Sequence, residues 1–141
     1  MHEKFSHYKV NRTFSNLTFL GLIFMVYDWD CFIEVLQHCP KLQTLLIVKY
    51  ADRNPDDKKW VQRSQPVPKC LTSHLKKFTL KNFRGWECEL QFAKYILQNA
   101  KVLRSMRICS VAFSNPEAKF ELIRKLSLCP RRSETCKLSF E

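Results

Sequence analysis

The chain repeats one spacing of apolar residues at four places. In each copy an apolar residue is followed by a second one three positions later and by a third two positions after that. Because the second and third residues are two positions apart, their side chains point to the same face of an extended strand. The spacing therefore predicts four short strands, each with one buried face, in copies that begin at Leu17, Leu42, Leu75 and Leu103.

Between these strands the apolar spacing changes to three and four positions, which is typical of an amphipathic helix. One helix is expected to begin after Asp30 as its N-cap and to end before Pro40, and a second covers residues 87–98. A third is expected to have Asn115 as its N-cap and Pro116 in its first turn. The helix residues expected to face the core are Phe32, Val35 and Leu36, then Leu90, Ala93, Ile96 and Leu97, and finally Phe120, Ile123 and Leu126.

The order of these elements indicates a repeat architecture. The strand copies begin 25, 33 and 28 residues apart, and a strand–helix unit of roughly this length is the signature of a leucine-rich repeat. Such a unit cannot form a core alone, so neighbouring units stack and share one. A last strand is expected at residues 137–140, with Leu138 and Phe140 turned inward. We therefore predict an α/β fold, an irregular leucine-rich-repeat-like βα solenoid with parallel strands on one side and helices on the other.

Residues 49–74 interrupt the repeat and are expected to form a long loop, partly ordered around Trp60. Long loops in compact domains are often functional. Tryptophan is enriched at the centres of protein interfaces, although we favour a role for Trp60 in clamping the loop onto the solenoid. Together with the neighbouring basic residues Lys58, Lys59 and Arg63, it enters the candidate interaction surface.

The positive charge of the chain is concentrated in its C-terminal part. The net charge is +11; residues 1–54 hold six Lys/Arg against five Asp/Glu, and residues 55–141 hold eighteen against eight. A basic surface suits either an acidic protein or a nucleic acid. Proteins that bind single-stranded nucleic acid interleave aromatic and basic residues, whereas here the aromatic residues mostly fall on core positions, which argues against nucleic acid. The basic residues are scattered between apolar ones, which favours a solvated, lysine-rich surface. Arg104, Arg107, Arg131 and Arg132 complete the candidate interaction surface.

The residue patterns that carry catalysis or hold a cofactor are not found in this sequence. The two glycines, Gly21 and Gly85, are too far apart for a phosphate-binding loop. The 7 cysteines form no CxxC pair and the 4 histidines do not supply one, so no metal site is predicted. Reduced, buried cysteines indicate a cytoplasmic or nuclear protein. The apolar run over residues 17–27 is too short to span a membrane.

Ser73 and His74 place a nucleophile directly beside a base in the sequence. Neighbouring side chains on a strand point to opposite faces, so the pair is not expected to act as nucleophile and base. We predict that the chain is not an enzyme and that it binds no cofactor and no metal.

A family resemblance begins near Trp60. It is carried by residues 66–76, 83–85, 89–90, 94–103 and 129–133, and by Cys136, Leu138 and Phe140. In order and spacing these residues resemble the FBD domain of plant F-box/LRR-repeat proteins. Residues 14–17 and 39–42 look like the last leucine-rich repeats that precede that domain. The resemblance implies leucine-rich repeats over residues 1–50 and an FBD domain over residues 51–141, with the loop at 49–74 followed by the C-terminal cap of the solenoid.

The resemblance also implies a function. In that family an N-terminal F-box recruits the adaptor and cullin parts of a ubiquitin ligase, and the repeats are taken to grip the protein to be ubiquitylated. No F-box-like segment lies in these 141 residues, so we do not expect this chain itself to bind adaptor and cullin. What carries over is a non-catalytic protein-interaction module whose partner is a ubiquitylation substrate.

Two alternatives stay open. One is a nucleic-acid-binding module, which the positive charge of the C-terminal part motivates. The other alternative is a truncated structural remnant, because the first repeat begins close to Met1 without the polar cap that solenoid ends need. For both alternatives, we expect this chain to be the tail of a longer protein or a shortened gene product. Its C-terminal end is expected to be finished.

Overall fold

Strands and helices follow one another along the chain in an order close to strict alternation. The structure, a computed structural model, describes residues 2–4, 13–24, 29–49, 66–110 and 115–141. Its strands are β1 (His2–Lys4), β2 (Phe19–Phe24), β3 (Thr44–Lys49), β4 (Lys77–Lys81), β5 (Ser105–Ile108) and β6 (Lys137–Phe140). Its helices are α1 (Trp29–Gln37), α2 (Lys69–Ser73), α3 (Glu87–Asn99) and α4 (Pro116–Ser127).

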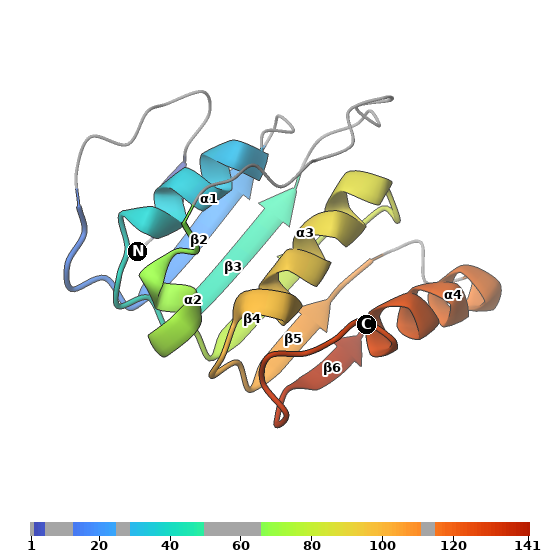
Figure 1. Cartoon of the computed structure of the whole chain (residues 1–141). Helices are drawn as coiled ribbons and strands as arrows, with labels where there is room; N and C mark the ends of the chain where they lie inside the picture. The colour runs from blue at the N-terminus through green and yellow to red at the C-terminus, as the bar shows by residue number, and fades with distance from the viewer. Residues whose placement is uncertain (1, 5–12, 25–28, 50–65, 111–114) are drawn as a thin grey trace.

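The described strands form one parallel sheet in the order β1-β2-β3-β4-β5-β6. Every strand therefore pairs with the next one in sequence. Parallel neighbours need a crossover connection, and from β2 onward the helices in these crossovers lie on the same face of the sheet (Figure 1). We call this side the covered face and the opposite side the open face. The predicted mixed α/β fold with a parallel sheet is confirmed.

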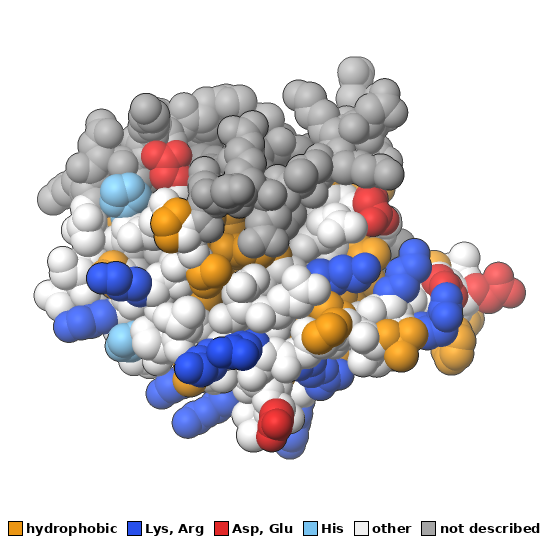
Figure 2. Space-filling model, viewed as in Figure 1, with side chains coloured by type: hydrophobic (Ala, Val, Ile, Leu, Met, Phe, Trp, Pro, Cys, Tyr) orange, Lys and Arg blue, Asp and Glu red, His pale blue; other side chains and the backbone are white. Residues whose placement is uncertain are grey.

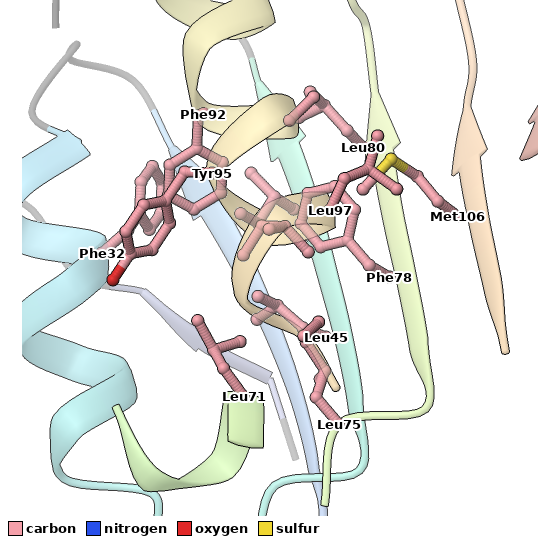
Figure 3. Packing of buried hydrophobic residues seen from close by; sticks show 14 of the residues in the cluster. Phe32, Leu45, Leu71, Leu75, Phe78, Leu80, Phe92, Tyr95, Leu97 and Met106 are labelled. Atoms are coloured by element: carbon pink, nitrogen blue, oxygen red, sulfur yellow. The ribbon is translucent and has the colours of Figure 1, made fainter. Parts of the chain in front are cut away.

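The core lies between the sheet and the helices. Phe92 of α3 stands at its centre, with its ring 5.9 Å from that of Phe32 in α1 and 6.1 Å from that of Phe78 in β4 (Figure 3). Two rows of side chains in register across β2–β5 supply the sheet side, namely Leu20, Leu45, Phe78 and Met106, and Leu22, Ile47, Leu80 and Ile108. Each of these residues is 2% exposed or less. The alternation that predicted the strands thus selects the residues of the covered face.

Helix α4 begins as predicted. The Asn115 side-chain oxygen accepts hydrogen bonds from the backbone N–H groups of Glu117 (3.0 Å) and Ala118 (3.4 Å). The predicted inward stripe is wrong at Phe120, which is 67% exposed, whereas Leu122 and Leu126 are buried. The helix lies beside β6 at the end of the sheet (Figure 1), so it buries a narrower face than a helix covered on both flanks.

Three further expectations need correction. Asp30 lies inside α1, which begins at Trp29, and so it is not the N-cap. Residues 49–74 do not form one loop, because Lys49 ends β3 and Lys69–Ser73 form α2; a helical turn lets Cys70 and Leu71, both 0% exposed, face the core. Strand β1 was not predicted, because its three residues carry no apolar alternation.

Candidate interaction surface

The open face is built from the strand residues that alternate with the core rows. In β3 every second residue is buried, and β4 and β5 show the same alternation. Their outward side chains are exposed or half-buried. The described residues of the open face are Phe19, Ile23, Thr44, Leu46, Val48, Lys77, Thr79, Lys81, Ser105, Arg107, Lys137 and Ser139.

One half of the open face, over β2 and β3, is apolar. Phe19 is 36% exposed and Ile23 is 38% exposed. Ile23 is in register with Val48, and Leu46 is in register with Gly21, which adds no side chain between the two apolar residues of β2. Single exposed apolar residues are ordinary on protein surfaces. Two exposed residues of β2 and the half-buried Leu46 and Val48 of β3 together form an apolar patch of the kind that marks interaction sites.

The other half of the open face, over β4 to β6, is basic. Lys77, Ser105 and Lys137 are in register on three adjacent strands, which places the two lysines about 10 Å apart at the spacing of parallel strands. Lys81 and Arg107 are exposed further along β4 and β5. The Arg107 guanidinium donates to Glu141 at 2.5 Å and holds the pKa of that carboxyl below its ordinary value.

The basic half continues around the end of the sheet at which the strands begin. The backbone N–H groups of Arg104 and Ser105 both donate to the Lys76 carbonyl oxygen, at 2.8 and 3.1 Å, which holds consecutive turns side by side. Exposed cations, together with the half-buried Lys76, follow these turns, and Figure 2 shows Lys and Arg side chains gathered along this lower rim. We call them the basic rim: Lys41, Lys69, Lys76, Lys101, Arg104 and Arg132.

The predicted surface residues fall at different places. Arg107 lies on the open face, and Arg104 and Arg132 lie on the basic rim. Arg131 is turned into the loop before β6, where its guanidinium donates to the Cys136 carbonyl oxygen at 2.7 Å. The remaining four, Trp60, Lys58, Lys59 and Arg63, lie outside the described residues. Of these four described arginines, the structure thus places one on the open face and two on the basic rim.

Sequence reasoning missed the lysines at positions 77, 81 and 137, which supply most of the basic half. The signal that could have found them is the strand alternation itself, because polar residues between core positions of a strand face outward together. Scattered basic residues become one surface only when neighbouring strands are paired in register.

A buried ion pair ties β3 to the start of α3. The Lys49 ammonium and the Glu89 carboxylate are in contact, with side chains 1% and 0% exposed. The Trp86 ring lies over the ammonium, 4.7 Å away. Burial lowers the pKa of Lys49, and the adjacent carboxylate partly offsets that effect. The sequence analysis did not find this pair, because 40 residues separate its members.

The same carboxylate also organises the turn before α3. It accepts hydrogen bonds from the backbone N–H groups of Arg84 (3.0 Å) and Trp86 (2.9 Å), so Glu89 forms the side-chain half of a capping box. Asn82, which adopts a φ of 61°, donates from its side chain to the Lys49 carbonyl oxygen at 2.7 Å. Lys49 and Glu89 together thus tie the end of β3 to the turn before α3.

The strand-based argument about Ser73 and His74 is wrong. Both residues lie at the C-terminal end of α2, where the Ser73 hydroxyl oxygen is 2.6 Å from Nδ1 of His74. The Ser73 hydroxyl also has an acceptor in the Lys69 carbonyl oxygen, at 2.8 Å, so the imidazole of His74 is one of two partners within its reach.

Within the described part of the chain, no group of three or more His, Cys, Asp or Glu side chains is placed to hold a metal ion. None of the helices there is long and apolar enough to cross a membrane.

These observations define a parallel α/β protein with one helix-covered face and one open face. The family model for the FBD domain matches residues 62–108. The chain is 32% identical over 142 residues to an F-box/FBD/LRR-repeat protein of Arabidopsis thaliana, covering 98% of this chain and 32% of that protein. It is 30% identical over 125 residues to an FBD-associated F-box protein of the same plant, covering 89% of this chain and 26% of the relative. No solved structure matches the chain.

The resemblance to the FBD domain of plant F-box/LRR-repeat proteins is therefore confirmed. The chain spans about a third of the length of the curated relatives that it matches. The matched segment contains α2, β4, α3 and β5, so it includes Glu89 but not Lys49. The buried ion pair thus joins the FBD segment to the strand before it.

Proposed function

We propose that this chain is a non-catalytic protein-interaction module, the recognition part of an F-box/LRR-type protein that selects substrates for a ubiquitin ligase. The observation that carries the proposal is the open face, where apolar and basic side chains are exposed or half-buried on one side of the sheet. A stable core does not require exposed apolar side chains on the outer side of β2. The names of the relatives, which join F-box, FBD and LRR, agree with an interaction role.

We further propose that the strand–helix units continue a leucine-rich-repeat solenoid. The strands are parallel and sequential, and the turns before them repeat one hydrogen-bond pattern. The N–H groups of Gln43 and Thr44 donate to the Thr18 carbonyl oxygen, and those of Lys76 and Lys77 donate to that of Gln43. A hydrogen-bond pattern that recurs between each unit and the next is typical of stacked repeats.

The interaction function is tested by proximity labelling in plant cells with the full chain. One variant carries Ile23→Glu and Leu46→Glu on the open face. The matched control carries Phe120→Glu and Leu128→Glu, which make the same chemical change at two exposed residues of and next to α4. We expect a set of labelled proteins that the first variant loses and the control keeps. Identical sets for all three chains, with unfolding midpoints matched, would contradict the proposal.

A nucleic-acid-binding module is the second candidate, and the basic rim favours it. It predicts binding of a 20-base-pair duplex or a single-stranded RNA by the full chain that weakens steeply as salt rises. Fluorescence anisotropy with labelled oligonucleotides at low and high salt measures this. Absence of binding at low salt removes the candidate.

A further inference from the structure

We propose that the open face binds a polypeptide segment that places apolar side chains over β2 and β3 and Asp or Glu side chains over β4 to β6. The proposal rests on the proposed interaction function and specifies the surface and the chemistry of its partner. It joins two observations, the division of the open face into an apolar and a basic half and the register that makes each half continuous.

The basic half carries more charge than its own acids neutralise. Lys77, Lys81, Arg107 and Lys137 are all exposed there. Among the described residues of β2 to β6 and the turns before β3 to β6, the one exposed acid is Glu134, and Glu141 at the chain end pairs with Arg107. Like charges on neighbouring strands repel one another. Carboxylates of a partner relieve this repulsion and form charge-assisted hydrogen bonds with the lysine and arginine donors.

The apolar half of the open face favours a protein over a nucleic acid as the partner. A phosphate backbone gains from the basic half and from the basic rim, but it leaves Phe19, Ile23 and Leu46 in contact with water. A polypeptide that carries both side-chain classes covers both halves, because burial of apolar surface adds to the electrostatic attraction. The charge complementarity and the apolar patch together therefore select a mixed apolar and acidic segment.

The dimensions of the face set the length of the segment. Four strand spacings separate β2 from β6, which is about 19 Å. An extended polypeptide covers that distance with about six residues, of which every second one faces the sheet. The segment is thus expected to hold an apolar cluster next to an acidic cluster, within roughly one strand length of each other.

The test is a selection of random 12-residue peptides displayed on phage against the full chain, followed by affinity measurements on the selected peptides. We expect an enriched pattern in which apolar residues neighbour Asp or Glu. The double variant K77E/R107E should weaken the binding of these peptides by about tenfold or more, because two attractive charges become repulsive. The control K119E/K125E makes the same change in net charge on α4 and should stay within about twofold.

Charge reversal of the peptide sharpens the test. A selected peptide with its Asp and Glu replaced by Lys should lose binding to the natural chain and regain it on K77E/R107E. Equal binding of the original peptide to K77E/R107E and K119E/K125E would show that the open face is not the binding surface. Selected peptides without Asp or Glu would show that the partner segment is not acidic. Oligonucleotide binding that K77E/R107E abolishes, with no peptides selected, would replace the protein partner by a nucleic acid.

These outcomes are separate from those of the labelling experiment. Face-dependent partners in cells together with failure of acidic peptides would leave the interaction function standing and remove only the inferred chemistry. Loss of both results would remove the interaction function as well.

Discussion

The two faces of one sheet differ although the same strands build both. On the covered face of β4, Phe78 and Leu80 are at most 1% exposed, whereas their neighbours Lys77 and Lys81 are exposed on the other side. Burial of the first set provides the free energy that holds the chain folded. The second set contributes little to that free energy, so its composition is available for recognition. Under the proposed function, stability and interaction thus fall to alternate residues of a strand.

The covered face also contains the structure's buried charge, whereas the charges of the open face stay in water. Lys49 is desolvated and must be paired with Glu89. Lys81 lies on the next strand in register with Val48, the neighbour of Lys49, and it is exposed. The two lysines therefore offer a matched pair for comparing the faces.

The largest effect is expected for a phenylalanine of the core. Phe78→Ala should lower the free energy of unfolding by about 4 kcal/mol, because it removes a buried ring and leaves a cavity. Phe19→Ala, at a residue 36% exposed on the open face, should cost about 1 kcal/mol or less. Urea unfolding followed by circular dichroism measures both. Equal losses would show that the two faces do not differ in this way.

The next effect concerns the two lysines. Lys49→Met keeps the side-chain volume but leaves the Glu89 carboxylate buried without its cation, and should cost about 3 kcal/mol. Lys81→Met makes the same chemical change in water and should leave the unfolding midpoint nearly unchanged. The added variant Lys49→Met with Glu89→Gln should recover part of the loss. A midpoint for Lys49→Met equal to that of Lys81→Met would argue against the ion pair.

A smaller effect is expected from the buried thiols at alkaline pH. Burial raises the pKa of Cys39 to about 11 and that of Cys70 to about 12. The unfolded chain loses these protons first as pH rises, so the stability that they contribute is present below the ordinary thiol pKa near 9 and is lost as pH rises toward 11 and 12.

The free energy of unfolding should therefore fall between pH 8 and pH 10 by about 1 kcal/mol for each thiol. The fall should be smaller in the variant Cys39→Ala with Cys70→Ala, measured by urea unfolding at both pH values. A fall of the same size in that variant would assign the pH dependence to other groups.

The smallest effect is expected for the ion pair at the surface. Arg107 and Glu141 are 47% and 55% exposed, and pairs so exposed contribute little to stability because water and salt screen them. Arg107→Ala should leave the thermal unfolding midpoint unchanged within error at low and high salt. The same variant should bind the acidic peptides selected on the natural chain more weakly. A midpoint shift of several degrees would give Arg107 a structural role instead.

The local pattern of apolar residues was sufficient for much of the fold. The spacing that begins at Leu42 and Leu75 predicted β3 and β4, and the helix spacing of three and four predicted α3. Asn115 and Pro116 marked the start of α4 correctly, because a cap acts on N–H groups two and three positions away. The FBD resemblance likewise depends on residues that lie close together along the chain. Each of these features is encoded within a few residues, where sequence distance and spatial distance agree.

Only the tertiary structure decided which residues far apart in the sequence lie next to one another. Lys49 meets Glu89 across 40 positions, and Lys77 comes beside Lys137 only through the shared register with Ser105. The helical spacing predicted that Phe120 faces the core, yet its side chain is exposed. The reason is that α4 lies at the end of the sheet, where fewer elements cover it. Periodicity determines which side chains share a face, and packing between distant elements determines whether that face is covered.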